Sequence, residues 1–166
     1  MTPLMSTPIP QTPAWEVRAN ESELAPSRLL PASSVGRVLQ AASSHLRSVS
    51  DAPRVEAEIL LMHVLDTSRS ALLTHPDKLL SSDQLSTFEA LVSERVLGYP
   101  LPHLTGRIEF YGLDIEVTPE VLIPRPETEA LVDLALRRHP KSIIDVGTGS
   151  GCIAVALAKE LPELEV

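Results

Sequence analysis

The stretch most suggestive of chemistry is a glycine-rich turn, Asp145-Val-Gly-Thr-Gly-Ser-Gly151. The β-branched run at 142–146 predicts a buried strand before it, and the composition of residues 153–161 predicts a helix after it. A strand that turns sharply into a helix needs residues that tolerate positive φ, and a ligand lying on the turn needs positions without side chains. The segment therefore predicts the first strand–loop–helix unit of a dinucleotide-type fold.

The glycine spacing distinguishes between ligands. The dinucleotide fingerprint is G-x-G-x-x-G, whereas this loop is one residue tighter and is preceded by the acid Asp145. S-adenosylmethionine has a sulfonium and an amino-acid head but no pyrophosphate, so it gains less than NAD from a helix N-terminus, and an acid can face its ammonium. The spacing favours this donor over a nicotinamide cofactor, although glycine-rich turns occur in many α/β folds.

The elements that would position this loop begin with helices. Apolar residues recur at helical spacing over residues 34–97, which predicts a small bundle of short helices. A first helix carries Val35, Val38, Leu39, Ala42 and Leu46, and a second, starting near Asp51-Ala-Pro53, carries the stripe Val55, Ile59, Met62 and Leu65. A short helix is expected over 70–74, and a longer one is expected from a Ser82-Asp83 cap to Gly98.

A change of pattern follows the helices. Residues 107–110 and 113–117 alternate in polarity around Tyr111-Gly112, which predicts a β-hairpin. Next come residues 121–129 and an amphipathic helix through Leu131, Val132, Ala135 and Leu136. Pro126 suits a first helical position, and Glu127 and Glu129 suit the positive end of the helix dipole better than a general-base role.

Composition narrows the function classes. The chain has 166 residues and a net charge of −8, which argues against general binding to nucleic acid or anionic membranes. Its only cysteine, Cys152, excludes an internal disulfide, fits the cytoplasm and is expected to pack in the interior. Five scattered histidines give no metal-site pattern. Six of the 15 prolines precede residue 32, which predicts an extended, disordered tail over residues 1–33.

Four segments together resemble a known family. They are Phe110-Tyr-Gly-Leu113, Val117-Thr-Pro119, Val121-Leu-Ile-Pro-Arg-Pro-Glu-Thr-Glu129 and Asp145-Val-Gly-Thr-Gly-Ser-Gly151. Their order and spacing are similar to those of the HemK-type peptide chain release factor glutamine methyltransferases. Residues 56–63 and 72–76 resemble the N-terminal helical domain of that family, so the resemblance covers about residues 34–166.

The resemblance implies a fold of class α + α/β. After the tail at 1–33, it implies a helical substrate-recognition domain over 34–105 and a β-hairpin linker over 106–124. Residues 125–166 would begin a Rossmann-like class I methyltransferase domain. The strand at 142–146 would have no parallel neighbour in this chain, so we expect it to expose an apolar face. We also expect residues 34–105 to fold alone while 141–166 stay loose or associate.

The implied function is methylation of the glutamine side-chain amide in the GGQ loop of release factors, with S-adenosyl-L-methionine as methyl donor. The implied cofactor-binding residues are Asp145, Gly147, Thr148, Gly149, Ser150 and Gly151, with Arg125 and Thr128 bordering the site. The family's catalytic Asn-Pro-Pro-Tyr loop is not in this sequence, whose only asparagine is Asn20. We therefore expect the front portion of the enzyme, inactive by itself, with no catalytic residue of its own.

Three alternatives remain at this point. The chain could be a non-catalytic helical module that binds a release factor or a ribosomal protein, since its acidic charge suits a basic partner. It could belong to a relative that methylates a ribosomal protein glutamine. A nicotinamide-dependent dehydrogenase is disfavoured by the glycine spacing.

Overall fold

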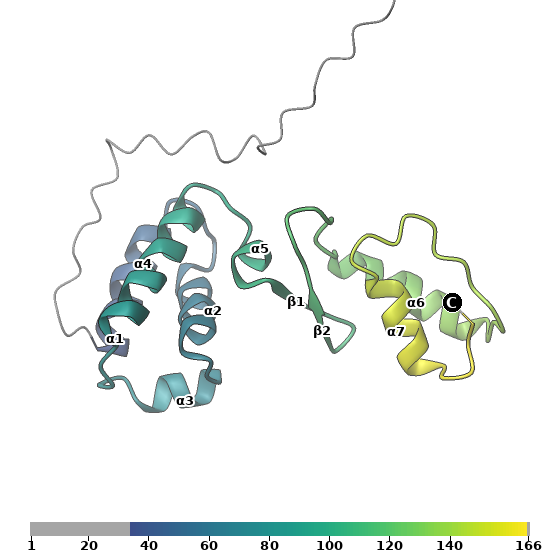
Figure 1. The fold of residues 1–166 in the computed structure, drawn as a ribbon, viewed down its shortest axis with the longest axis horizontal. Coiled ribbons are helices and arrows are strands. Elements are labelled where there is room, and N and C mark those ends of the chain that lie inside the picture. Colours follow the sequence, from purple (N-terminus) through teal and green to yellow (C-terminus); the bar gives the residue numbers. More distant parts are fainter. Residues whose placement is uncertain (1–33, 166) are drawn as a thin grey trace, which may run out of the picture.

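The computed structural model describes residues 34–165, which form mainly helices and one small sheet (Figure 1). The bundle comprises α1 (Val35–Leu46), α2 (Pro53–Leu65), α3 (Arg69–Thr74), α4 (Ser82–Val96) and α5 (Leu101–Thr105). It is followed by the strands β1 (Arg107–Phe110) and β2 (Leu113–Glu116), the 3-10 turn η1 (Pro126–Thr128), α6 (Glu129–Arg137) and α7 (Cys152–Glu160). The disordered tail predicted for residues 1–33 lies outside the described residues.

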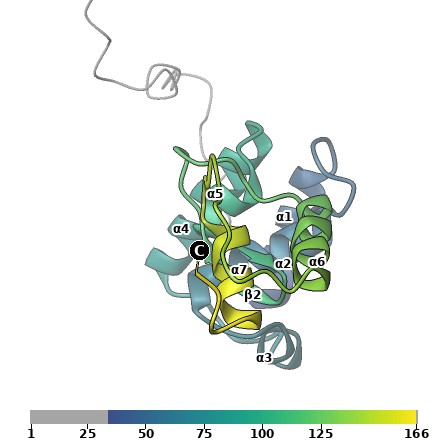
Figure 2. The same cartoon turned by 90° about the vertical axis from the view of Figure 1, so that its right-hand side faces the viewer.

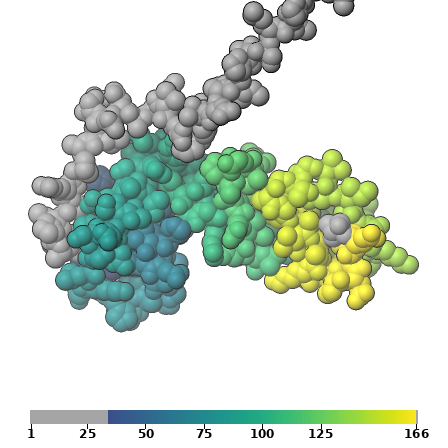
Figure 3. All heavy atoms as spheres, in the orientation of Figure 1, coloured from purple at the N-terminus to yellow at the C-terminus, as the bar shows by residue number. Residues whose placement is uncertain are grey.

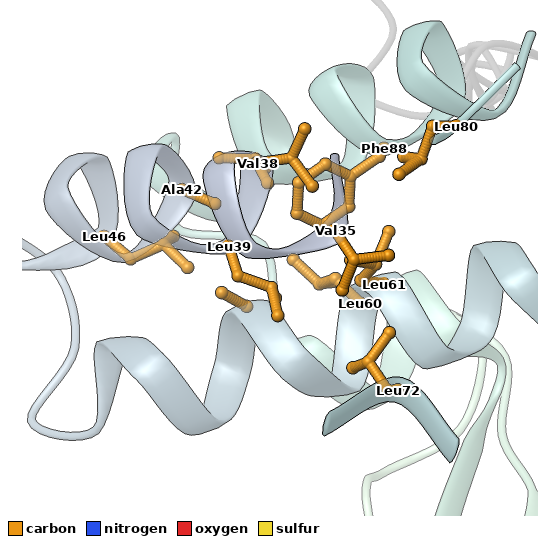
Figure 4. Packing of buried hydrophobic residues seen from close by; sticks show 12 residues of the cluster. Val35, Val38, Leu39, Ala42, Leu46, Leu60, Leu61, Leu72, Leu80 and Phe88 are labelled. Atoms are coloured by element: carbon orange, nitrogen blue, oxygen red, sulfur yellow. The ribbon is translucent and has the colours of Figure 1, made fainter. Parts of the chain in front are cut away.

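The bundle is built around one apolar core. α1 buries the five residues that its sequence spacing indicated, Val35, Val38, Leu39, Ala42 and Leu46. They face α2 and α4, and the Phe88 ring of α4 lies among them with no exposed surface (Figure 4). The four expected helices are confirmed as α1, α2, α3 and α4, and with them the helical bundle.

Three details of the bundle differ from expectation. The predicted α2 stripe is correct only in part: Met62 and Leu65 pack against the core, but Val55 is 44% exposed. The fully buried residues of α2 are Ala57, Leu60 and Leu61. α2 is apolar around much of its circumference, and the small Ala57 lies on the side that packs into the core. The α4 cap is Ser81 and not Ser82 or Asp83, since Ser81 and Gln84 form a reciprocal capping box. α5 was not anticipated from the sequence.

The predicted hairpin is present and belongs to a second core. β1 and β2 pair antiparallel, with Phe110 opposite Leu113 across the two-residue turn. The buried face of the hairpin packs with α6 and α7 in a cluster of Phe110, Ile115, Val117, Val132, Cys152, Ala156 and Leu157. The hairpin therefore lies between the bundle and the α6–α7 pair (Figure 3), and α6 and α7 lie next to each other when the molecule is turned (Figure 2).

The buried strand expected over residues 142–146 is not formed. Only Ser142 makes a bridge, parallel to Glu165, with Ile143 N–H donating to Glu165 O at 2.8 Å. Ile144 and Val146 are 88% and 90% exposed, as expected for a strand that lacks neighbours. A strand needs partners on its edges, and local β-branched composition cannot supply them.

A buried carboxylate ties α2 to α3. Glu58 is 3% exposed, and its two oxygens accept hydrogen bonds at 2.8 Å from Arg54 Nε and Arg69 Nε. Burial alone would raise the pKa of Glu58, but the hydrogen bonds from Arg54 and Arg69 outweigh it and hold that pKa below 4.5. A second ion pair, Arg95 Nε to Glu56 Oε2 at 2.8 Å, joins α4 to α2. Both pairs fix helices of the bundle against one another.

None of the helices within residues 34–165 has the length and apolar character needed to cross a membrane.

Glu58→Gln should destabilise the bundle by about 1–3 kcal/mol at pH 7, because the arginines lose a charged acceptor. A lowered folded-state pKa means that this stabilisation is complete above the usual value of 4.5 and is lost as the pH falls through the folded-state value. The gap between wild type and variant in urea unfolding should therefore close on acidification. Exposed Glu94→Gln in α4 is the matched control and should change little; equal midpoints for wild type and Glu58→Gln at pH 7 would contradict this assignment.

Candidate functional site

The glycine-rich turn is an exposed loop leading into α7. Gly147, Gly149 and Gly151 have φ values of +80°, +57° and +76°, a region that side chains disfavour. A Cβ added at Gly147 would meet no atom within 4 Å, and one at Gly149 would meet only a backbone oxygen at 3.9 Å. The glycines are therefore required by backbone conformation, and they leave open space in front of the loop.

The loop holds its own shape. Gly151 N–H donates to Thr148 O at 2.9 Å, and Thr148 Oγ1 donates to Asp145 O at 3.1 Å. Gly151 is the N-cap of α7 and provides no side-chain cap, so the first-turn N–H groups of the helix have no side-chain acceptor there. Such N–H groups form a site for electronegative atoms of a ligand.

Asp145 supplies the acidic group of the loop. Its residue is half-buried, and its Oδ2 is shielded from solvent without a hydrogen-bond partner among the described residues. A buried acceptor that is left unpaired is costly, so it favours a ligand that brings a donor such as an ammonium or a hydroxyl. The carboxylate and the open glycine positions lie on the same seven-residue segment.

Arg125 and Thr128 lie elsewhere in the chain, at η1. Arg125 is exposed, Thr128 is half-buried, and Thr128 N–H donates to Arg125 O at 2.9 Å. Within residues 34–165, no hydrogen bond or ion pair connects either residue to the glycine loop. The six expected positions from Asp145 to Gly151 thus lie on one continuous segment, and Arg125 and Thr128 lie on another.

Glu129 has a role that the sequence did not reveal. Its Oε1 accepts the Tyr111 N–H at 2.8 Å, and the Tyr111 hydroxyl donates to Asp133 Oδ1 at 2.9 Å. The hydrogen bond to Asp133, with burial and the nearby carboxylates, raises the pKa of Tyr111. The only sequence signal was the Tyr-Gly turn, whose first N–H is left unpaired by the strands.

In the described part of the chain, no three His, Cys, Asp or Glu residues come together as a possible metal-ligand set. Cys152 is buried in the second core beside Ala156 and Leu157, as expected for a packing residue.

Gly151→Ala should weaken the start of α7. Its added Cβ would make only ordinary contacts, at 3.8 Å to Thr148 and 4.0 Å to Val155, so the penalty is the positive φ, about 1–2 kcal/mol. Exchange of the Leu157 amide, measured by NMR, should accelerate accordingly. Ser150→Ala is the neighbouring control and should change it little; equal rates in the two variants would show that the loop does not need its left-handed glycine.

Comparison with known proteins identifies the bundle and relatives of a larger part of the chain. The PrmC N-terminal domain matches residues 37–106, which span the bundle. A release factor glutamine methyltransferase of Aliivibrio fischeri is 48% identical over 120 residues, covering 70% of this chain and 42% of the relative. Proteins of the same name from Koribacter versatilis and Escherichia coli are 42% and 45% identical, covering 78% and 77% of this chain.

The chain spans less than half the length of these relatives, 42–48% of each. The aligned part contains the bundle and extends well beyond it, since the longest of the three alignments covers 135 residues. By its sequence, the chain therefore corresponds to the N-terminal portion of the HemK-type release factor glutamine methyltransferases.

Proposed function

We propose that the chain provides the methyl-donor loop and the substrate-recognition bundle of an S-adenosylmethionine-dependent protein-glutamine methyltransferase that acts on release factors. The observation that carries this proposal is the loop before α7, where three alternate glycines adopt positive φ near Asp145. The shielded Oδ2 of Asp145 has no hydrogen-bond partner within residues 34–165. The names of the relatives add the substrate class, since they are release factor glutamine methyltransferases.

The loop suits the charge and shape of this donor. S-adenosylmethionine, when bound, supplies an electrophilic methyl group on a sulfonium. The Asp145 carboxylate would accept a hydrogen bond from its ammonium or a hydroxyl, which would satisfy the shielded Oδ2. Gly147 and Gly149 would let the ligand approach the backbone, with Thr148, Ser150 and Gly151 completing the wall. Arg125 and Thr128 are proposed to border the same site.

The Rossmann-like continuation is also a proposal. The parallel bridge between Ser142 and Glu165, on either side of α7, is the arrangement with which a strand–helix–strand unit begins. Ile144 and Val146 point to solvent with the composition of a parallel strand that is covered on both faces. We propose a division into a bundle over 34–105, a hairpin over 106–124 and the beginning of a methyltransferase domain from 125.

The acceptor half of the reaction needs groups that this sequence lacks. An amide nitrogen is a weak nucleophile because its lone pair is delocalised, so transfer demands in-line placement and acceptors for the amide N–H groups. The expected acceptors lie in an Asn-Pro-Pro-Tyr loop, and the only asparagine here is Asn20. The role proposed for this chain is to hold the donor and the protein substrate in the cytoplasm. Methyl transfer would also require the acceptors of the Asn-Pro-Pro-Tyr loop.

A second candidate function is a binding module without catalysis. It is favoured by the bundle, which has a complete core of its own and matches a domain over residues 37–106. The partner would be a release factor or, alternatively, a ribosomal protein. Titrating each protein into the labelled chain should move amide signals of α1–α5 only for the true partner.

The donor proposal can be tested by NMR titration of the 166-residue chain. Adding S-adenosylmethionine should shift the amide signals of Gly147, Gly149 and Gly151, whereas NAD should leave them nearly unchanged. Gly149→Val should weaken the response at least about tenfold, because a β-branched residue cannot easily adopt a φ of +57°.

The matched control is Gly98→Val in the bundle, another exposed glycine with positive φ and open space at its Cβ. This control should leave the donor-induced shifts intact. No shift at the loop with S-adenosylmethionine, or equal shifts with NAD, would refute the donor assignment while leaving the binding-module alternative standing.

A further inference from the structure

Among the described elements, the hairpin forms the main connection between the two cores. Its base adjoins the bundle, because β1 begins directly after Gly106, the C-cap of α5, and β1 contacts α5. At this base the Gly106 carbonyl accepts Val117 N–H at 2.9 Å, which joins the two ends of the hairpin. α5 itself packs on the bundle core through Leu101 and Leu104. The buried face of the hairpin contributes to the second core with α6 and α7. The hairpin thus lies between the bundle and the α6–α7 pair that carries the glycine loop (Figure 1).

The tip of the hairpin is held by two hydrogen bonds. Tyr111 and Gly112 occupy the two turn positions with φ values of +53° and +66°. Phe110 and Leu113 pair across the turn, so the strands leave Tyr111 N–H without a partner. Glu129 Oε1 accepts this N–H at 2.8 Å, and Asp133 Oδ1 accepts the Tyr111 hydroxyl at 2.9 Å.

The two acceptors lie on one side of α6. Glu129 and Asp133 are four residues apart, which places them one above the other on the helix surface. One accepts from the backbone of Tyr111 and the other from the end of its side chain, so the tyrosine is held at both ends. A non-glycine residue with positive φ persists where its surroundings compensate for the strain, and these contacts provide that compensation.

We propose that Tyr111, Glu129 and Asp133 form a tip brace that fixes the orientation of the helical bundle relative to the glycine loop. Glu129 is then a positioning residue. Its carboxylate is engaged by a backbone N–H, which explains the acid at the start of α6 more specifically than interaction with the helix dipole. If the proposed function holds, the brace also sets the distance between a protein substrate on the bundle and the donor on the loop.

The test measures distances between spin labels and needs neither donor nor release factor, so it can fail independently of the proposed function. Labels are placed at exposed Ser86 in α4 and Lys159 in α7 through S86C and K159C, in a C152A background. The reference chain should give one narrow distance distribution. Combining Glu129→Ala with Tyr111→Phe should broaden it by about twofold or more, since both bonds are lost.

Two variants separate the brace from general destabilisation. Glu129→Gln keeps an acceptor oxygen, so it should give the same narrow distance distribution as the reference chain. Its Tyr111 amide should also exchange as slowly as in the reference chain. In Glu129→Ala, by contrast, that amide should exchange at least about tenfold faster. Asp114→Ala removes an exposed ion pair to Arg107 on the same hairpin and should leave the distances unchanged.

A narrow distribution in the double variant, together with faster exchange of the amide of residue 111, would overturn the proposal, because the bonds would be lost without any change in orientation. If the double variant loses helical content, the distance distribution of the single variant Tyr111→Phe is used to test the brace instead. It removes only the bond to Asp133, and an unchanged distribution in that variant would equally overturn the brace.

Discussion

Burial of one face of the β1–β2 hairpin is the constraint on which the second half of the structure depends. A two-stranded hairpin is marginal in water, and helices of nine residues such as α6 and α7 are marginal as well. Each becomes stable only by covering the other: Phe110 and Val117 on the hairpin are 1% and 3% exposed, and Val132 on α6 is fully buried. The glycine loop joins the two helices of this cluster, so its position follows from the packing of the hairpin.

The elements that sequence analysis predicted correctly are those whose determinants are local. α1 has a single apolar stripe, so only one face could be buried. The Tyr111-Gly112 turn indicated the hairpin because few residue pairs adopt two successive positive φ values. α2 has apolar residues on more than one side, so its sequence alone does not show which side is buried. Its contacts with α1 and α4 place Ala57 in the core and leave Val55 exposed. The short α5 follows Pro100, contains Pro102 and ends at Gly106, and it has too few turns to show a period.

The same division applies to the candidate site. The left-handed glycines were predictable because a backbone conformation is a property of a few consecutive residues. The roles of Glu58 and Glu129 were not, since a charged residue on a helix is usually exposed. Arg69 and Tyr111, which donate hydrogen bonds to them, lie on other elements. The strand over 142–146 was predicted wrongly as buried for the same reason: its burial depends on neighbours that no local pattern contains.

The loop and the strand before it therefore differ in what they require. Ile144 and Val146 leave most of their apolar surface in water, although covering each would contribute about 1.5–3 kcal/mol. The loop already has its conformation, because glycine φ values, the Thr148 hydrogen bonds and the first turn of α7 suffice to define it. The glycine-rich turn is thus shaped by its own residues and by α7, without strands paired beside it among the residues that the structure describes.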